Sequence, residues 1–549
     1  MRSFWEEIRY FWSDRFYAVV VSLAAVCSYG FKISHETIGI DDTCIPLYFE
    51  EGLAPAVGRW TLYLINKFFH ISDFSPWMTE LAGVLLLLFA ATAWCVVFSR
   101  ILAREKHMIV CYTFFAALFL SCPLISEIYV YYLHNGVSLA YGLTAIALLL
   151  LLKVMERGAG KKKRLLGTVA AAAVLTAALG CYESFMIVFA VGMLLLFILI
   201  RGFGNREQRY CASPWAWVGL LAATVISAIL FRWLILKLIL GIYHIEIPED
   251  FRVEYRGVFS FVDMNITDVL MVFKRQWLKY YLNAFAYRPI TILVLGILIL
   301  LTVCVAIGIR KKDIFLPLAA LAVPVLPICM VIIEGKDTYY RAAQYVPLIG
   351  AFAVFLLLRL VKEHLPGACM AVGMAFAFIL LWDQCAEMNK WFYVDHMKYQ
   401  DAKSVMEQIA YDLERDHDAE KPVIFRGAYY VPYGIVKDAY LEYGSVNYGW
   451  IRRLGDMVDP HLVEKYNGEN GYGYGFAETP INSALRWGVT AFDGTGAQLG
   501  NFMEMLGHDF EIETDLLKIE EAQKLAEEMP GFPETGYIRE YEEYIIVNF

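Results

Sequence analysis

Eleven apolar segments, separated by charged connections, constrain the fold of this chain more than any other feature of its sequence. A bilayer core about 30 Å thick is crossed by roughly 20 apolar residues in helical conformation. Hydrophobic residues make up 59% of the chain. We therefore predict a polytopic α-helical membrane protein with about 11 transmembrane helices. The predicted spans are 16–31, 79–98, 108–126, 137–152, 165–180, 185–200, 215–233, 289–309, 314–333, 345–358 and 367–381.

The basic residues of the connections predict the orientation of these helices. Lys and Arg are retained on the cytoplasmic side, so connections rich in them belong inside. Alternate connections are poor in both, and 127–136 and 181–184 contain neither. Eleven crossings then place the N-terminus inside and the C-terminal residues outside the cytoplasmic membrane. The first segment lacks a small-residue cleavage site, so we expect a retained helix. The basic connections carry Arg2, Arg9, Arg15, Arg100, Arg104, Lys106, Lys153, Arg157, Lys161, Lys162, Lys163, Arg164, Arg201, Arg206, Arg209, Arg310, Lys311, Lys312, Arg359 and Lys362.

The charge of the chain changes sign near residue 385. Residues 385–549 contain 14 Lys+Arg and 30 Asp+Glu, whereas residues 1–384 contain 33 and 26. An acidic outer part agrees with the predicted orientation and argues against nucleic-acid binding. We predict a transmembrane catalytic domain at 1–384 and a small extracytoplasmic α/β domain at 385–549. The eleven cysteines form no C-x-x-C pair, so we expect neither a zinc site nor a disulfide framework.

Periodicity outlines the elements of the C-terminal residues and of one long outer connection. We place the join between the two domains in the aromatic stretch 382–399. Beyond it we expect helices at 401–415, 497–506 and 520–528, and strands at 422–428, 488–492 and 537–549. Tyr- and Gly-rich loops at 429–448 and 466–476 could stack on sugars or serve only as surface loops. Residues 261–285 have the spacing of an amphipathic helix that lies in the membrane interface.

The polar residues of the membrane part gather at the outer ends of the predicted helices. A transporter usually places ionisable groups near the bilayer midplane. A rim of polar groups instead suits a reaction at the outer surface on a lipid-borne substrate. The rim consists of Asp41, Asp42, Arg59, Glu127, His134, Asn135, Tyr182, Glu183, Arg288, Glu334, Lys336, Asp337 and Arg341.

Asp41 and Asp42 are the candidate catalytic residues, because they follow the first span directly. Glycosyl transfer needs a carboxylate that deprotonates or orients the acceptor hydroxyl. The pair could also hold a divalent cation such as Mg²⁺ or Mn²⁺, so these are the candidate metal ligands if any metal is used. The structural alternative is that Asp42 caps a short helix over 43–51.

Two arginines and a tryptophan are candidates for substrate binding. Arg59 and Arg341 could each make bidentate contacts with a phosphate, and Trp60 could stack on a sugar. Alternatively the arginines anchor lipid headgroups and Trp60 belongs to the aromatic belt of the interface.

The short outer turns supply three further candidates. Tyr182 and Glu183 lie in the tightest turn, where a glutamate close to hydrocarbon is costly unless it is paired or functional. The alternative for Glu183 is an ion pair with Arg59 or Arg341. His134 ends another short outer loop, where a lone histidine is more often structural than functional.

Several of these motifs resemble one known family. GIDDTCIPLY after the first span, GRW, CYESF between two spans, RAAQY and WDQCAEMNKWFYVDHMKYQDA are similar to the GtrII-type glucosyltransferases of bacterial membranes, over nearly the whole chain. The resemblance implies a GT-C fold with an active site in the outer loops. It also implies transfer of glucose or another hexose from a polyprenyl-phosphate carrier to a cell-surface polysaccharide. One residue of the pair Asp41 and Asp42 would be the base, and Arg59, Glu183 and Arg341 would hold the carrier phosphate and the sugar.

We therefore expect a membrane glycosyltransferase whose partners are a polyprenyl-phosphate-linked sugar, a surface glycan acceptor and the lipid bilayer. The alternative is a flippase or transporter of lipid-linked sugars, which requires a polar path through the bilayer. The charge-poor helix centres weigh against such a path. A receptor or scaffold with an inert membrane anchor is the third hypothesis, for which eleven spans are excessive.

Overall fold

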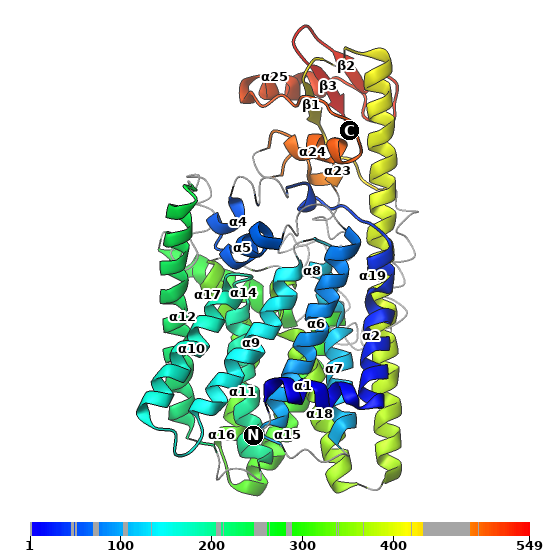
Figure 1. Ribbon diagram of the computed structural model, residues 1–549. Helices are drawn as coiled ribbons and strands as arrows, with labels where there is room; N and C mark the ends of the chain where they lie inside the picture. Colours follow the sequence, from blue (N-terminus) through cyan, green and yellow to red (C-terminus); the bar gives the residue numbers. More distant parts are fainter. Residues whose placement is uncertain are drawn as a thin grey trace.

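The protein, described by a computed structural model, is a bundle of long, roughly parallel helices that carries a smaller C-terminal part at one end (Figure 1). The structure describes residues 3–44, 49, 52–69, 76–102, 108–132, 134–204, 210, 211, 213–245, 261, 262, 264–281, 288–335, 338, 340–365, 367–418, 420–431, 484–491 and 494–549.

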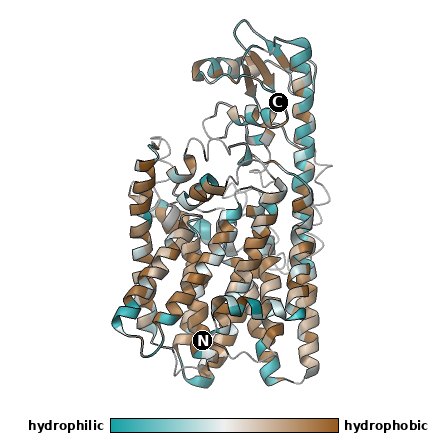
Figure 2. Cartoon of the chain, viewed as in Figure 1, coloured by the Kyte–Doolittle hydropathy of each residue, from teal (hydrophilic) through white to brown (hydrophobic). Residues whose placement is uncertain are grey.

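The long helices of the bundle follow the predicted apolar segments. They are α2 (Arg15–Ser34), α6 (Pro76–Ser99), α7 (Ile109–Leu120), α9 (His134–Val154), α10 (Lys161–Leu179), α11 (Phe185–Phe203), α12 (Pro214–Ile242), α15 (Arg288–Lys311), α18 (Val346–His364) and α19 (Gly367–Asp416). Within the described residues, 8 helices are long and apolar enough to cross a membrane. Hydrophobic residues cover most of the bundle, and hydrophilic ones gather toward its two ends (Figure 2).

The predicted count of eleven spans is supported only in part. Segments 165–180 and 345–358 are helical, as α10 and α18, but neither is among the eight. Segment 314–333 is divided into α16 (Phe315–Ala322), the 3₁₀ helix η6 (Leu326–Cys329) and α17 (Met330–Glu334). Pro324 and Pro327 explain the division, because proline lacks the N–H that a continuous helix requires.

Aromatic side chains fill the core of the bundle. Trp94, Tyr17, Phe98 and Phe114 are fully buried, and Tyr17 donates a hydrogen bond of 3.0 Å to Thr92 Oγ1 between α2 and α6. In a membrane, van der Waals packing and such hydrogen bonds hold helices together, since lipid tails are as apolar as the helices themselves.

The two ends of the bundle differ in structure. We call upper the end at the top of Figure 1, which carries α4 (Leu53–Ala56), α5 (Trp60–Phe69) and α8 (Ser126–Tyr129). Three 3₁₀ helices join them there: η1 (Asp42–Cys44), η3 (Pro123–Ile125) and η7 (Tyr340–Ala342). The lower end carries α1 (Phe4–Ser13) and the connection between α9 and α10.

Helix α19 joins the bundle to the C-terminal part without a break. The predicted join at 382–399 and the predicted helix at 401–415 both lie inside this single helix of 50 residues. Its first half packs on α2, where Ser28 Oγ and Cys385 Sγ are 3.3 Å apart. Its second half buries Met406, Ile409 and Leu413 in a separate core formed with C-terminal residues.

The C-terminal residues form a three-stranded sheet with helices beside it (Figure 1). The strand order is β1 (Val423–Arg426), β3 (Ile545–Asn548), β2 (Ile538–Glu540), with β1 parallel and β2 antiparallel to β3. The predicted strand at 422–428 is β1, and the single strand predicted at 537–549 is the pair β2 and β3. The strand predicted at 488–492 is wrong over its described residues, because a turn follows α23 (Ala484–Trp487) there. The remaining helices are α24 (Ala497–Met505) and α25 (Leu516–Ala526), close to the predictions. The loop 466–476 and most of 429–448 lie outside the described residues.

The amphipathic helix predicted at 261–285 is α14 (Ile266–Tyr281). Ile266, Leu270 and Trp277 are exposed along one side, whereas Val272 and Gln276 are buried on the other. An exposed apolar stripe of this kind is typical of a helix that lies in the membrane interface.

Candidate functional site at the upper end of the bundle

The two adjacent aspartates have different surroundings. The Asp42 carboxylate is buried and accepts hydrogen bonds from the backbone N–H groups of Gly39, at 2.9 Å, and of Tyr132, at 2.8 Å. It therefore fastens the loop after α2 to the loop before α9. The proposed helix over 43–51 lies mostly outside the described residues, so its capping by Asp42 stays a prediction.

Burial governs the protonation of Asp42. Removal from water raises its pKa to about 7, against the opposing effects of the two backbone hydrogen bonds and Lys32. A carboxyl group with this pKa changes its charge close to neutral pH.

Asp41 lies at the open side of the same loop, with its side chain 31% exposed. Its Oδ2 is 3.5 Å from Nη1 of Arg341, 300 residues further along the chain. The same Nη1 donates to the hydroxyl of Tyr131 at 3.2 Å. Burial, and next the Asp41 carboxylate, raise the pKa of Tyr131 well above its usual range, so this phenol stays neutral.

Two glutamines fix the backbone around Arg341. Gln344 donates from Nε2 to the Arg341 carbonyl at 2.6 Å, and its own Oε1 and carbonyl accept from the Tyr141 hydroxyl of α9. Gln276 of α14 exchanges two hydrogen bonds with Thr338, at 2.7 and 3.0 Å. The backbone segment that carries Arg341 is therefore held from both α9 and the amphipathic helix α14.

The second arginine, Arg59, directly precedes α5. Its guanidinium lies 5.1 Å from the ring centroid of Tyr182, a geometry that suits a cation–π contact. Helix α5 is docked on the end of α10, since the Thr61 N–H donates to the Gly180 carbonyl at 2.9 Å. Trp60 is buried at this junction with Leu53, so it anchors the residue that directly follows Arg59.

Asp41 and both arginines line one small cavity of about 50 Å³. A space of this size holds water molecules but not a hexose. One carboxylate and two cationic groups thus meet at a single opening of the upper end. The cavity is lined by Asp41, Arg59, Leu62, Ile128, Tyr131, His134, Val137, Cys181, Tyr182 and Arg341.

Glu183 is paired beside this cavity with a partner that the sequence did not suggest. Its Oε1 is 2.6 Å from Nη2 of Arg232 in α12, rather than against Arg59 or Arg341. The pair lies over Gly58, whose φ of +85° favours glycine and which the end of the flexible Arg232 side chain approaches closely. The ion pair therefore ties α12 to the turn between α10 and α11, and it packs over the turn that precedes Arg59.

His134 reaches the cavity from a buried polar cluster. Its Nδ1 is 2.7 Å from the Tyr131 carbonyl, and its Nε2 is 3.5 Å from Glu80 in α6. Glu80 in turn lies 3.6 Å from the ammonium of Lys32 in α2. Lys32, Glu80 and His134 thus link three helices, and His134 connects this cluster to the cavity.

The aspartate pair fits a divalent cation poorly. Both oxygens of Asp42 accept backbone N–H groups, and Asp41 faces the positive charge of Arg341. Among the described residues, no cluster of three His, Cys, Asp or Glu side chains could hold a metal ion. Within the described residues, the positive groups that line the cavity are Arg59 and Arg341.

The C-terminal part touches the aspartate loop directly. Asn501 of α24 donates from Nδ2 to the Thr43 carbonyl at 2.9 Å. Ile38 and Tyr132, on either side of the Asp42 hydrogen bonds, belong to the hydrophobic core of the C-terminal part. The C-terminal part therefore packs directly against the loop that carries Asp41 and Asp42.

The structure brings Asp41, Arg59, His134, Tyr182 and Arg341 to one cavity, whereas Asp42, Trp60 and Glu183 support its walls. Sequence reasoning missed Arg232, Glu80 and Lys32, because each lies near the end of an apolar run. Their charge could have indicated them, because a charged side chain at the edge of the hydrocarbon region is costly unless it has a partner. Of the other rim residues, Lys336 and Asp337 lie outside the described residues, and the side chains of Arg288 and Glu334 are not described.

Comparison with known proteins adds one finding. A family model described as glucosyl transferase GtrII matches residues 30–358. The match begins within α2, includes every residue of the cavity, and ends within α18. No curated protein and no solved structure gives a significant match.

Proposed function

The chain belongs to the GtrII glucosyltransferase family, and from this premise we propose that it transfers glucose from a polyprenyl-phosphate carrier to a cell-surface polysaccharide or related glycopolymer. The reaction takes place at the outer face of the cytoplasmic membrane, in a fold of the GT-C class. The observation that carries this proposal is the meeting of one carboxylate, Asp41, with two arginines, Arg59 and Arg341, at a single cavity.

In this proposal Asp41 is the general base of one direct displacement. It takes the proton of the acceptor hydroxyl while that oxygen forms a bond to the anomeric carbon of the sugar. The bond between this carbon and the carrier phosphate breaks, and its electron pair leaves with the phosphate oxygen. Arg341 and Arg59 stabilise the charge that develops on this leaving group.

Donor binding would exchange the partners of Arg341. Without substrate its Nη1 is 3.5 Å from Asp41, and a cavity of about 50 Å³ is too small for the sugar. A phosphate is a strong bidentate partner for a guanidinium and competes with the carboxylate. Its arrival would draw Arg341 from Asp41, open the cavity and leave the carboxylate facing the acceptor.

The other candidate residues have supporting roles in the proposal. Asp42 positions the loop that carries Asp41, since both of its oxygens hold backbone groups. Tyr182 and His134 border the sugar, while Trp60 and Glu183 hold the elements that present Arg59. The C-terminal part, seated on the Asp42 loop, presents the acceptor.

The distribution of basic residues supports the proposed orientation. The lower end carries Lys153, the run from Lys161 to Arg164, and the run from Arg310 to Lys312. Because such residues stay on the cytoplasmic side, the upper end faces outward. We keep eleven crossings, with the N-terminus inside, as part of this proposal.

The test is transfer of radiolabelled glucose from its polyprenyl phosphate to polymer in membranes that contain the full chain. Wild-type membranes should label a surface glycan, and Asp41→Asn should abolish the label. Asp268→Asn, an exposed carboxylate change on α14, is the matched control and should retain the label. Movement of the lipid-linked sugar across reconstituted vesicles without any new glycosidic bond would favour a flippase and overturn the proposal.

A further inference from the structure

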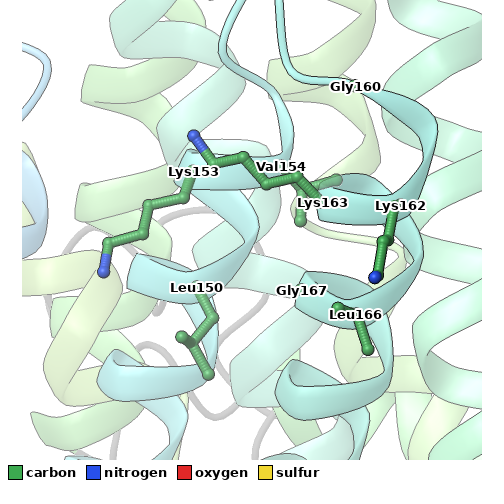
Figure 3. A pocket seen from close by; sticks show the side chains of 8 residues that line it. All are labelled: Leu150, Lys153, Val154, Gly160, Lys162, Lys163, Leu166 and Gly167. Atoms are coloured by element: carbon green, nitrogen blue, oxygen red, sulfur yellow. The ribbon is translucent and has the colours of Figure 1, made fainter.

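A second cavity lies at the opposite, lower end of the bundle, between the end of α9 and the start of α10. Its volume is about 630 Å³, in the size range of pockets that hold small molecules. Figure 3 shows the side chains around it. They are Leu150, Lys153, Val154, Gly160, Lys162, Lys163, Leu166 and Gly167.

The walls of this cavity are apolar and open to the outside of the bundle. Leu150 and Val154 come from α9, and Leu166 comes from α10. Leu166 is 58% exposed and its neighbour Leu165 is 67% exposed. Exposed leucines beside a groove suit a hydrocarbon chain rather than water.

The rim of the cavity is strongly basic. Residues 153–164 contain six Lys or Arg and one acidic residue, Glu156. Glu156 is 3.3 Å from Lys163, but within the described part of the chain neither Lys153 nor Lys162 has an ion pair. In Figure 3 the ammonium groups of Lys153 and Lys162 lie on opposite sides of Leu150 and Leu166.

The start of α10 breaks the usual rule for helix charges. The positive end of the helix dipole favours acidic residues, yet the first three residues of α10 are Lys161, Lys162 and Lys163. Its N-cap, Gly160, supplies no side-chain hydrogen bond to the first-turn amides. A bound anion would neutralise these lysines and accept hydrogen bonds from the uncapped N–H groups.

We propose that this cavity binds an acidic phospholipid of the bilayer. The headgroup phosphate lies at the first turn of α10 beside Lys162, and Lys153 reaches it from across the leucines when its flexible side chain turns toward α10. One acyl chain runs along Leu150, Val154 and Leu166. The proposal does not depend on the glycosyl-transfer chemistry, because the cavity and the candidate site are at opposite ends of the bundle.

The apolar wall selects a lipid over a soluble phosphate. A soluble anion would gain from the lysines and the helix amides alone, whereas a lipid also covers the exposed leucines. Basic residues at the membrane surface each strengthen the binding of acidic lipids about five-fold.

The experiment measures binding of dioctanoyl phosphatidylglycerol to the purified full chain in phosphatidylcholine nanodiscs, by native mass spectrometry. We expect Lys153→Gln/Lys162→Gln to weaken binding roughly 25-fold, at about five-fold for each lysine. Leu166→Gln should also weaken binding, although it leaves every charge in place. The matched control is Arg310→Gln/Lys312→Gln, which removes two exposed charges from the same end of the bundle. It should change binding less than two-fold, by roughly the scatter of such measurements.

Two results would overturn the proposal. Equal losses in the control and in Lys153→Gln/Lys162→Gln would mean that only the overall surface charge attracts the lipid. Competition by glycerol 3-phosphate as strong as by dioctanoyl phosphatidylglycerol would mean that a soluble anion is the ligand. Glucose transfer by each variant serves as the check that it is folded, since none of these residues belongs to the candidate site.

Discussion

The candidate site at the upper end of the bundle and the second cavity at its lower end both collect positive charge, but they assemble it differently. At the upper end each ionic partner comes from a distant part of the chain: Asp41 meets Arg341, and Glu183 meets Arg232. At the lower end the lysines of residues 153–163 are close neighbours in sequence and most of them are exposed. Arginines held by tertiary contacts can be aimed at one atom of a substrate, whereas a local run of lysines provides a general attraction for anions.

The substitution Asp41→Asn is the strongest test of this difference. Loss of a general base typically lowers the rate 10²–10⁴-fold, so we expect transfer to fall about 10³-fold. The stability should stay within about 0.5 kcal/mol, because this side chain is partly exposed. Transfer assays and melting curves of the purified variant measure both effects. Full activity of Asp41→Asn would show that Asp41 takes no part in the reaction. The contrast between a catalytic upper site and a general anion-binding lower site would then no longer hold.

Replacement of Arg341 by Gln should have the next largest effect. A missing cation at the leaving group costs about 10²-fold or more in the rate. Arg341→Lys keeps the charge but loses the planar fork, so we expect only part of the activity to return. Arg310→Gln at the lower end is the matched control and should leave the initial rate of transfer unchanged. Similar losses in Arg310→Gln and Arg341→Gln would indicate that total charge, not position, matters.

Asp42→Asn should lower the stability of the protein and should affect the transfer reaction only indirectly. An amide can accept only one of the two backbone N–H groups and presents its own NH₂ to the other, at a cost of about 1–3 kcal/mol. Unfolding of the variant in detergent, followed by circular dichroism, measures this loss. A stable variant that lacks transfer activity would instead assign the chemistry to Asp42.

The same residue gives the wild type a pH dependence. Burial raises the pKa of Asp42 from 3.8 to about 7, so the folded state binds more protons than the unfolded state between these values. The contribution of Asp42 to stability therefore falls as the pH rises from about 4 to about 7 and is level above that range. Melting curves across this range should show the decline in the wild type and a flatter profile in Asp42→Asn. Parallel profiles of the two proteins would contradict the burial of this carboxyl group.

The Glu183–Arg232 pair should give the smallest effect. Both side chains are about one quarter exposed, at 22% and 27%, so water screens their attraction. A double-mutant cycle with Glu183→Gln and Arg232→Gln should yield a coupling energy of about 1 kcal/mol in thermal stability. A coupling near zero would show that the pair does not hold α12 to the turn between α10 and α11.

Much of the bundle could be predicted from apolar runs, because a helix that faces lipid needs them along its whole length. The aspartate loop and the two arginines could be found as charges at the ends of these runs. Asp41 and Asp42 could not be distinguished, since only the fold decides which of two neighbours turns inward. The predicted partner of Glu183 was wrong because Arg232 lies inside the apolar span predicted at 215–233, and only the fold brings it beside Glu183 and Gly58.

The unbroken course of α19 was the main feature of the fold that the sequence analysis missed. Aromatic and amide residues at 382–399 suggested an interface between domains. The stretch from 374 to 416 nevertheless contains neither glycine nor proline, so nothing in it ends a helix. For predicting whether the helix continues through 382–399, the absence of glycine and proline was a better guide than the change in composition.

Helix α19 also sets the distance between the cavity and the C-terminal sheet, because it is continuous from the bundle to the C-terminal part. Its 50 residues extend about 75 Å at 1.5 Å per residue. Seven residues inserted after Asp395 would lift the sheet by about 10 Å while turning it by only about 20°. The sheet would still face the cavity, but Asn501 could no longer reach the Thr43 carbonyl. In the proposed reaction, the length of this one helix would therefore limit how tall an acceptor can fit between the C-terminal part and Asp41.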